Sequence, residues 1–116
     1  LFLSAGRGEY RKAKLKISET QIDLSIKQQA TEIKIKSYHN ELITLQKQVA
    51  LQSNNYASYT QLLKAEESKF YNGESSMFLI NSRETKALEA LEKLIDLKTK
   101  YFKTLYALQW SAGLLK

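Results

Sequence analysis

Few residues in this chain could do chemistry. His39 is the only histidine and there is no cysteine, so the sequence can build neither a His–His pair nor a thiolate metal site. His39 has Glu41 nearby but no nucleophile at a helical spacing, and we interpret it as an exposed helix residue. Glu66–Glu67 and Glu89–Glu92 have the residue types of an acid–base pair, but their helical surroundings indicate solvated faces.

No motif adds to this set, since the sequence contains no glycine-rich phosphate loop and no metal-ligand spacing. We therefore predict no catalytic, cofactor-binding or metal-ligating residues and no enzymatic activity. The carboxylates instead favour helix formation. Four acid-before-base pairs lie four residues apart, an arrangement that stabilises helices: Asp23/Lys27, Glu32/Lys36, Glu89/Lys93 and Asp96/Lys100.

The composition excludes several classes of protein. In 116 residues there are four glycines and no proline, too few turn signals for an all-β sandwich or barrel. A hydrophobic content of 43% and seven tyrosines argue against disorder. No uninterrupted apolar run approaches the roughly 20 residues of a transmembrane helix. The chain opens at Leu1 without a charged, then apolar leader, so we expect a fragment or a mature product.

A net charge of +6 raises the question of nucleic acid. The basic residues are densest near the start of the chain, around Tyr10, where they could contact phosphates: Arg7, Arg11, Lys12, Lys14 and Lys16. No helix-turn-helix, basic zipper or aromatic RNA platform accompanies them. We therefore predict no nucleic-acid partner.

The glycines divide the chain into two long segments. No glycine or proline occurs between Glu9 and Phe70 or between Glu74 and Ala112. This pattern predicts an all-α fold, a long antiparallel helical hairpin of coiled-coil type. We expect one domain over 1–116, with helix 1 at about 9–71, a tip turn at 72–75 and helix 2 at about 76–112. At 1.5 Å per residue the helices would span roughly 94 Å and 55 Å.

Apolar residues at alternating spacings of three and four predict the seam between the helices. In helix 2 the predicted seam is Met77, Ile80, Glu84, Ala87, Leu91, Leu94, Lys98, Tyr101, Leu105, Leu108 and Ala112. In helix 1 it is Ile35, Tyr38, Leu42, Leu45, Val49, Gln52, Tyr56, Tyr59, Leu63, Glu66 and Phe70. Hairpin geometry then pairs Phe70 with Met77, Leu63 with Glu84 and Tyr56 with Leu91.

Apolar residues outside this seam predict further partners. Leu88, Ile95 and Phe102 form a second stripe on helix 2. The first ~25 residues of helix 1 would overhang helix 2, given their lengths, yet they carry apolar residues on more than one face. We predict that the overhang packs against another helix or another copy through Ile17, Ile22, Leu24, Ile26 and Ile33. The chain is therefore expected to belong to a larger bundle or oligomer.

The turn has suitable residues for reversing the chain. Asn72 and Gly73 can adopt the left-handed conformation that ends a helix. Either Ser75 or Ser76 can cap helix 2, and Glu74 lies near its positive end. Helix 1 is also rich in glutamine and other uncharged polar residues, which is typical either of an ordinary solvated face or of a helix that lines an aqueous duct.

Three blocks of the sequence resemble outer-membrane efflux proteins of the TolC type. The first, LFLSAGR at 1–7, is similar to the end of a strand that opens a long helix in that family. The second, FYNGESSMFLINSR at 70–83, is similar to the family's most recognisable stretch, and the third, YFKTLYALQWSAG at 101–113, to its closing block. Their order and spacing fit the family over essentially the whole chain.

The resemblance implies one half-repeat, the C-terminal one, of a trimer whose outer-membrane β-barrel continues into a periplasmic α-helical tunnel. Leu1–Ala5 would end a barrel strand, and the tip would close the tunnel at rest and meet a periplasmic adaptor that works with an inner-membrane pump. The implied docking and gating residues are Phe70, Tyr71, Asn72, Gly73, Glu74, Ser75 and Ser76. The implied location is the outer membrane of a Gram-negative bacterium, with this segment mainly in the periplasm. The resemblance implies no cofactor.

Two departures qualify what the resemblance implies. Phe78 stands where many members have an aspartate near the constriction, and Ser82–Arg83 replaces the usual alanine-glutamine pair. The tip is therefore hydroxyl-rich and apolar, and a cation-selective acidic ring is not expected. The alternative from another functional class is the coiled-coil hairpin of a periplasmic adaptor or a scaffold protein.

Overall fold

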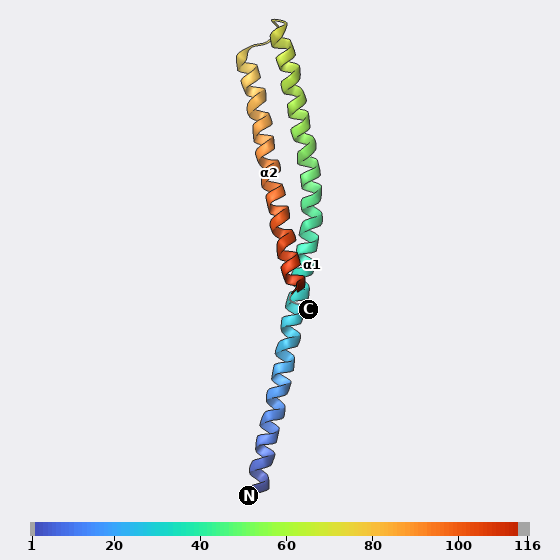
Figure 1. Cartoon of the computed structure of the whole chain (residues 1–116), viewed down its shortest axis with the longest axis vertical. Helices are drawn as coiled ribbons and strands as arrows, with labels where there is room; N and C mark the ends of the chain where they lie inside the picture. The colour runs from blue at the N-terminus through green and yellow to red at the C-terminus, as the bar shows by residue number, and fades with distance from the viewer. Residues whose placement is uncertain (1, 114–116) are drawn as a thin grey trace.

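Two long helices joined by one turn make up the structure, a computed structural model that describes residues 2–113 and only the backbone of Phe2. Helix α1 runs from Phe2 to Tyr71 and helix α2 from Met77 to Gly113. They lie antiparallel, with the turn at one end of the molecule (Figure 1). The molecule measures 106 × 19 × 15 Å, so its length is that of α1, about 105 Å at 1.5 Å per residue. The predicted helical hairpin is confirmed.

The predicted strand at the N-terminus is wrong for the residues that can be compared. We expected Leu1–Ala5 to end a barrel strand, but Phe2–Ala5 is the first turn of α1, and Leu1 lies outside the described residues. Residues 2–113 contain no strand with which a strand at Phe2–Ala5 could pair. A lone strand would leave its backbone groups without partners, whereas a helix satisfies them locally. For the same reason α1 begins seven residues before the predicted Glu9.

The seam on α1 follows the predicted spacing. Leu42, Leu45 and Glu66 are buried, and the other predicted positions are half-buried, except Tyr59 and Phe70, which are exposed and lie at the border of that class. All positions from Leu3 to Ala30 are exposed. The hairpin core therefore lies along residues 31–66 of α1, and the segment before it, residues 2–30, has no partner among the described residues.

The seam on α2 is rotated from the predicted one. Its shared positions are buried or half-buried as predicted, namely Ile80, Ala87, Leu94, Tyr101 and Leu108. Their companions, however, are Arg83, Ala90, Leu97, Thr104 and Ser111. The predicted companions are instead exposed (Met77, Glu84, Lys98 and Ala112) or only half-buried (Leu91 and Leu105).

Size and charge explain this rotation. Ala90, only 3% exposed, lets the two helix backbones approach closely. Glu84 and Lys98 remain in water because a charged group buried without a partner would cost several kcal/mol. The rotation therefore takes the Lys98 charge out of the seam in favour of Leu97, and it puts the small Ala90 in place of Leu91.

Interhelical hydrogen bonds hold the register of the hairpin. The Gln52 side-chain amide donates to the Ala90 carbonyl at 3.0 Å. Toward the open end, the Gln46 amide donates to the Tyr101 hydroxyl at 3.4 Å, and the Thr104 hydroxyl donates to a Glu41 carboxylate oxygen at 3.3 Å. These polar residues lie at or beside the seam, so sliding one helix along the other would break their bonds. The observed partners agree with the predicted pairing to within a helical turn or two.

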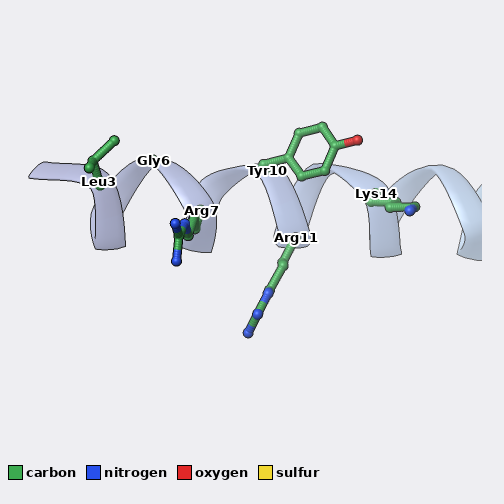
Figure 2. A pocket seen from close by; sticks show the side chains of 6 residues that line it. All are labelled: Leu3, Gly6, Arg7, Tyr10, Arg11 and Lys14. Atoms are coloured by element: carbon green, nitrogen blue, oxygen red, sulfur yellow. The ribbon is translucent and has the colours of Figure 1, made fainter.

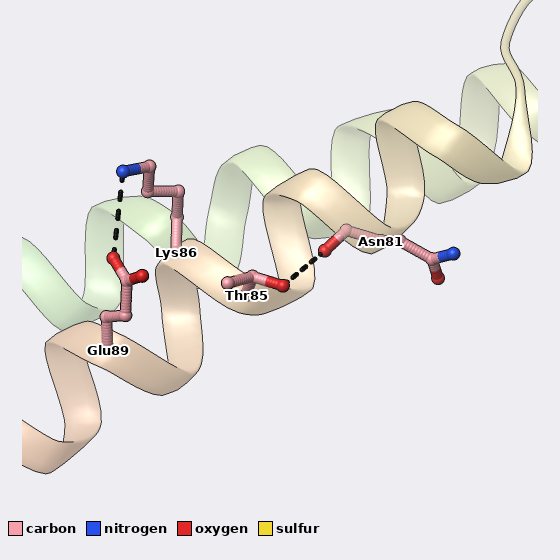
Figure 3. A network of polar contacts seen from close by, with 4 residues as sticks. All are labelled: Asn81, Thr85, Lys86 and Glu89. Atoms are coloured by element: carbon pink, nitrogen blue, oxygen red, sulfur yellow. Dashed lines mark hydrogen bonds and ion pairs between the residues drawn. The ribbon is translucent and has the colours of Figure 1, made fainter.

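The exposed faces hold the remaining polar contacts. Lys86 and Glu89 form an ion pair at 3.6 Å, and the Thr85 hydroxyl donates to the Asn81 carbonyl at 2.9 Å (Figure 3). None of the four predicted pairs at i,i+4 is within ion-pair distance in the part of the chain that the structure describes. An exposed pair contributes about 1 kcal/mol or less, so these charges serve mainly to solvate the helix faces.

No helical stretch among residues 2–113 combines the length and the apolar character needed to cross a bilayer.

Candidate functional site at the hairpin tip

The turn closes α1 with a glycine in the left-handed conformation. Gly73 has a φ of 77°, and no other residue of the described chain has a positive φ. The Gly73 amide donates to the Phe70 carbonyl at 3.0 Å, and the Glu74 amide donates to the Lys69 carbonyl at 2.8 Å. Together these bonds form the Schellman motif. The predicted reversal over 72–75 is confirmed, and Gly73 rather than Asn72 adopts the left-handed conformation.

Ser76 is the residue that caps α2. Its hydroxyl accepts a hydrogen bond from the Leu79 amide at 3.3 Å, and its carbonyl accepts one from the Ile80 amide at 3.1 Å. This is the geometry of an N-cap. Of the two serines that could have capped the helix, Ser76 therefore does so, and Ser75 is free for another contact.

Ser75 instead bonds a buried carboxylate. Its hydroxyl donates to an Oε1 oxygen of Glu66 at 2.5 Å, and Glu66 is only 6% exposed. The interpretation of Glu66–Glu67 as a solvated face is thus wrong for Glu66, although Glu67 is exposed. Glu66 occupies a seam position, and the turn brings Ser75 within reach of it. This bond links the turn to the last helical turns of α1.

Apolar side chains surround the turn and remain in water. Tyr71 is 86% and Phe78 is 79% exposed, and Met77 and Leu79 are also exposed. Phe70 contacts Tyr71 edge to face, with ring centroids 6.3 Å apart. The tip is therefore an apolar cap on a polar turn, a combination that marks interaction surfaces. The predicted docking residues end at Ser76 and leave out Met77, Phe78 and Leu79, although Phe78 was expected near the constriction and the three form an apolar run beside the turn.

The structure brings the seven predicted tip residues together. They form one continuous turn from the end of α1 to the cap of α2: Phe70, Tyr71, Asn72, Gly73, Glu74, Ser75 and Ser76. All except Ser75 are exposed. Among the described residues no group of three or more His, Asp or Glu side chains could hold a metal ion. What this arrangement offers chemically is an exposed surface of aromatic rings, hydroxyls and one carboxylate.

The five residues predicted to pack against a partner do not come together on one line. All are exposed on α1: Ile17, Ile22, Leu24, Ile26 and Ile33. Ile17 and Leu24 are seven residues apart and share one face, while Ile22, Ile26 and Ile33 share another. Packing by these residues remains a prediction.

A groove between the helices runs beside the seam. Its α1 side is lined by Gln46, Val49, Ala50 and Ser53, and its α2 side by Lys98, Tyr101 and Phe102. Phe102 continues the predicted second stripe with Leu88 and Ile95, and all three side chains are exposed. The groove and the stripe thus meet at Phe102.

The glutamines of α1 serve two different purposes. Gln46 and Gln52 donate across the hairpin, whereas the others are exposed: Gln21, Gln28, Gln29, Gln48 and Gln61. Gln46 is exposed as well, so Gln52 alone among these residues is half-buried.

Comparison with known proteins adds no relative: no protein-family model, curated protein or solved structure matches this chain at a significant level.

Proposed function

We propose that this chain is a tunnel segment of a trimeric, TolC-like outer-membrane channel that exports small molecules or proteins. The observation that carries the proposal is the second apolar stripe on α2. Leu88, Ile95 and Phe102 repeat every seven residues and stay exposed beside a seam that is already filled. One face of α2 packs against α1, and the second apolar stripe leaves another face available. Such a helix can pack against neighbours on two sides, as in a tunnel wall made of helices. Export itself is supported by the resemblance of the three sequence blocks.

The proposed mechanism is passive conduction. The exposed polar residues of α1, such as Gln48 and Gln61, offer hydrogen bonds without fixed charge, so hydrated cargo can pass without being held by ionic contacts. Energy comes from an inner-membrane pump, which connects to the channel through a periplasmic adaptor. In this scheme the chain catalyses no reaction. It forms part of the tunnel wall and supplies the tip that opens and closes.

The tip is the proposed gate and docking site. Tyr71 and Phe78 give an apolar surface that can close against neighbouring tips or accept an adaptor. Phe78 provides no charge at the constriction, so the proposal includes no acidic selectivity ring. The Glu66–Ser75 bond holds the turn against α1, which suggests that the tip moves as one unit.

Charge reversal at the tip tests this proposal. Glu74→Lys should weaken export and adaptor cross-linking in cells, because it places a cation on the docking surface while leaving the backbone bonds of the turn in place. The added cation lies near the positive N-terminal end of α2, and this repulsion should lower the stability of the hairpin by about 1 kcal/mol or less. Glu92→Lys, at an exposed position of α2 away from the tip, is the matched control.

Three quantities should be measured for both variants: export, adaptor cross-linking and abundance of the protein in the outer membrane. We expect normal abundance for both and impaired export and cross-linking only for Glu74→Lys. If both variants export and cross-link like the parent protein, the tip is only a turn and a helix cap.

A further inference from the structure

A cluster of basic side chains near the start of α1 is not used by the hairpin. Between Leu3 and Ile17 there are five basic residues and one acidic residue, Glu9. All of these residues are exposed, and the ion pair found in the described chain lies on α2 instead. This end of the molecule is about 100 Å from the tip, given the length of α1. The cluster therefore has no role in forming the hairpin or its turn.

Three of the cations share one side of the helix. Arg7, Arg11 and Lys14 follow the i, i+4, i+7 spacing that places side chains along one face, and they line an open hollow together with Leu3, Gly6 and Tyr10. Glu9 is two residues from both Arg7 and Arg11, a spacing that does not place side chains face to face. The three cations therefore lack a neutralising carboxylate on their own face.

Apolar side chains border the same hollow. In Figure 2, Leu3 and the Tyr10 ring lie along one edge of the helix, while Arg7 and Arg11 extend toward the other edge. Gly6 lies between Leu3 and Tyr10, and a Cβ atom there would meet nothing within 4 Å. Ile17 continues the apolar edge seven residues after Tyr10. The surface thus combines a row of cations with a parallel apolar edge that includes one tyrosine.

We propose that this surface binds the phosphate headgroups of anionic phospholipids. Guanidinium and ammonium groups bind phosphate oxygens, and an aromatic and aliphatic edge beside them can enter the boundary between headgroups and acyl chains. Nucleic acid would match the cations but has no counterpart for the apolar edge of Leu3, Tyr10 and Ile17. The placement of this end next to the membrane rests on the proposed function, in which the tip points away from the outer membrane. Headgroup binding itself can be measured without it.

Vesicle flotation of the full chain tests the proposal. Vesicles of phosphatidylcholine alone are compared with vesicles that also contain phosphatidylglycerol. We expect binding only to the second kind, and weaker binding as salt is raised. A basic residue near an anionic surface contributes about a fivefold gain in affinity. Replacing Arg7, Arg11 and Lys14 together by glutamine should therefore lower the affinity on the order of a hundredfold.

The matched control removes three cations elsewhere. Lys93, Lys100 and Lys103 are exposed on α2, and their joint replacement by glutamine should leave vesicle binding within a few-fold of the parent chain. Circular dichroism confirms that both triple variants remain helical. Equal losses in the two variants would show that net charge alone governs binding and would overturn the assignment to this surface.

A fluorescence reporter locates the contact. Tyr10→Trp in a Trp110→Phe background leaves one indole, at the apolar edge. We expect its emission to shift to the blue on anionic vesicles, and an unshifted emission would overturn the proposed insertion. Release of the chain by millimolar inorganic phosphate would indicate a free-phosphate site, and tighter binding to duplex DNA at the same salt would indicate nucleic acid. Either result would overturn the proposal, whereas loss of export with vesicle binding intact would concern the proposed function alone.

Discussion

The Glu66–Ser75 hydrogen bond makes a quantitative prediction about the tip. Ser75→Ala removes the side-chain partner of a carboxylate that is 6% exposed. A hydrogen bond to a charged group contributes about 1.5–3 kcal/mol, and most of this is lost when the buried acceptor is left unpaired. We therefore expect Ser75→Ala to lower the free energy of unfolding by about 2 kcal/mol and to lower Tm by several degrees.

Replacing the carboxylate should have a different effect. Glu66→Leu puts an apolar side chain at a seam position and leaves only the half-buried Ser75 hydroxyl to find water. Apolar replacement of a buried charge is often neutral or stabilising, so we expect a change of less than about 1 kcal/mol. In the Glu66→Leu background, Ser75→Ala should then cost almost nothing. The coupling between the two positions is therefore expected to be about 2 kcal/mol.

Urea unfolding followed by circular dichroism measures these values, at one protein concentration because self-association changes apparent stability. Ser68→Ala is the matched control, since Ser68 is an exposed residue of the same stretch and its loss should change stability by less than about 0.5 kcal/mol. If Ser75→Ala costs the same with Glu66 present or replaced, the bond does not stabilise the tip and the reasoning fails.

Three further predictions concern the backbone, the seam and the overhang. Gly73→Ala should destabilise the hairpin by about 1–2 kcal/mol through the positive φ of this position alone, because the added Cβ has open space. Gly6 has equally open space but lies in α1, so Gly6→Ala should raise the helicity measured by circular dichroism. Changes in helicity of the same sign in both variants would contradict this. Ala90→Leu should cost about 1–3 kcal/mol in urea unfolding, since Ala90 is a seam residue only 3% exposed, and an unchanged midpoint would mean that the helices are not in close contact there. The chain should self-associate in sedimentation velocity, and glutamine at both Ile22 and Ile26 should shift it toward monomer; a parent chain that stays monomeric at high concentration would refute packing by the overhang.

The reversal and the α1 seam were predictable because each depends on local pattern. Asn72–Gly73 lies between two long segments that contain no glycine or proline, and only a glycine takes a φ of 77° at little cost. From Ile35 to Leu63 the apolar spacing on α1 offers one consistent face. Where a single face collects the apolar residues, burial follows from the hydrophobic effect alone.

The rest depends on contacts that a linear pattern does not weigh. On α2 two candidate seams share Ile80 and Leu94, and counting apolar residues favours Leu91 over Ala90. The structure prefers Ala90 because backbone approach matters more there than side-chain area. Glu66 likewise fits the seam by spacing and the surface by charge, and its burial depends on Ser75 beyond the turn. No residue pattern of this kind tests the docking role of the tip, which remains a proposal.

The register of the hairpin also determines the order in which it forms. Its hydrogen bonds join residues 9 apart in the turn, at Glu66–Ser75, and then 38 apart at Gln52–Ala90 and 63 apart at Glu41–Thr104 between the helices. Since closing a longer loop costs more entropy, contacts near the turn form first and the helices zip toward the open end. Changes near Ser75 should therefore alter mainly the folding rate, and changes near Thr104 mainly the unfolding rate. We therefore expect folding to start at the tip, the end that is proposed to bind the adaptor.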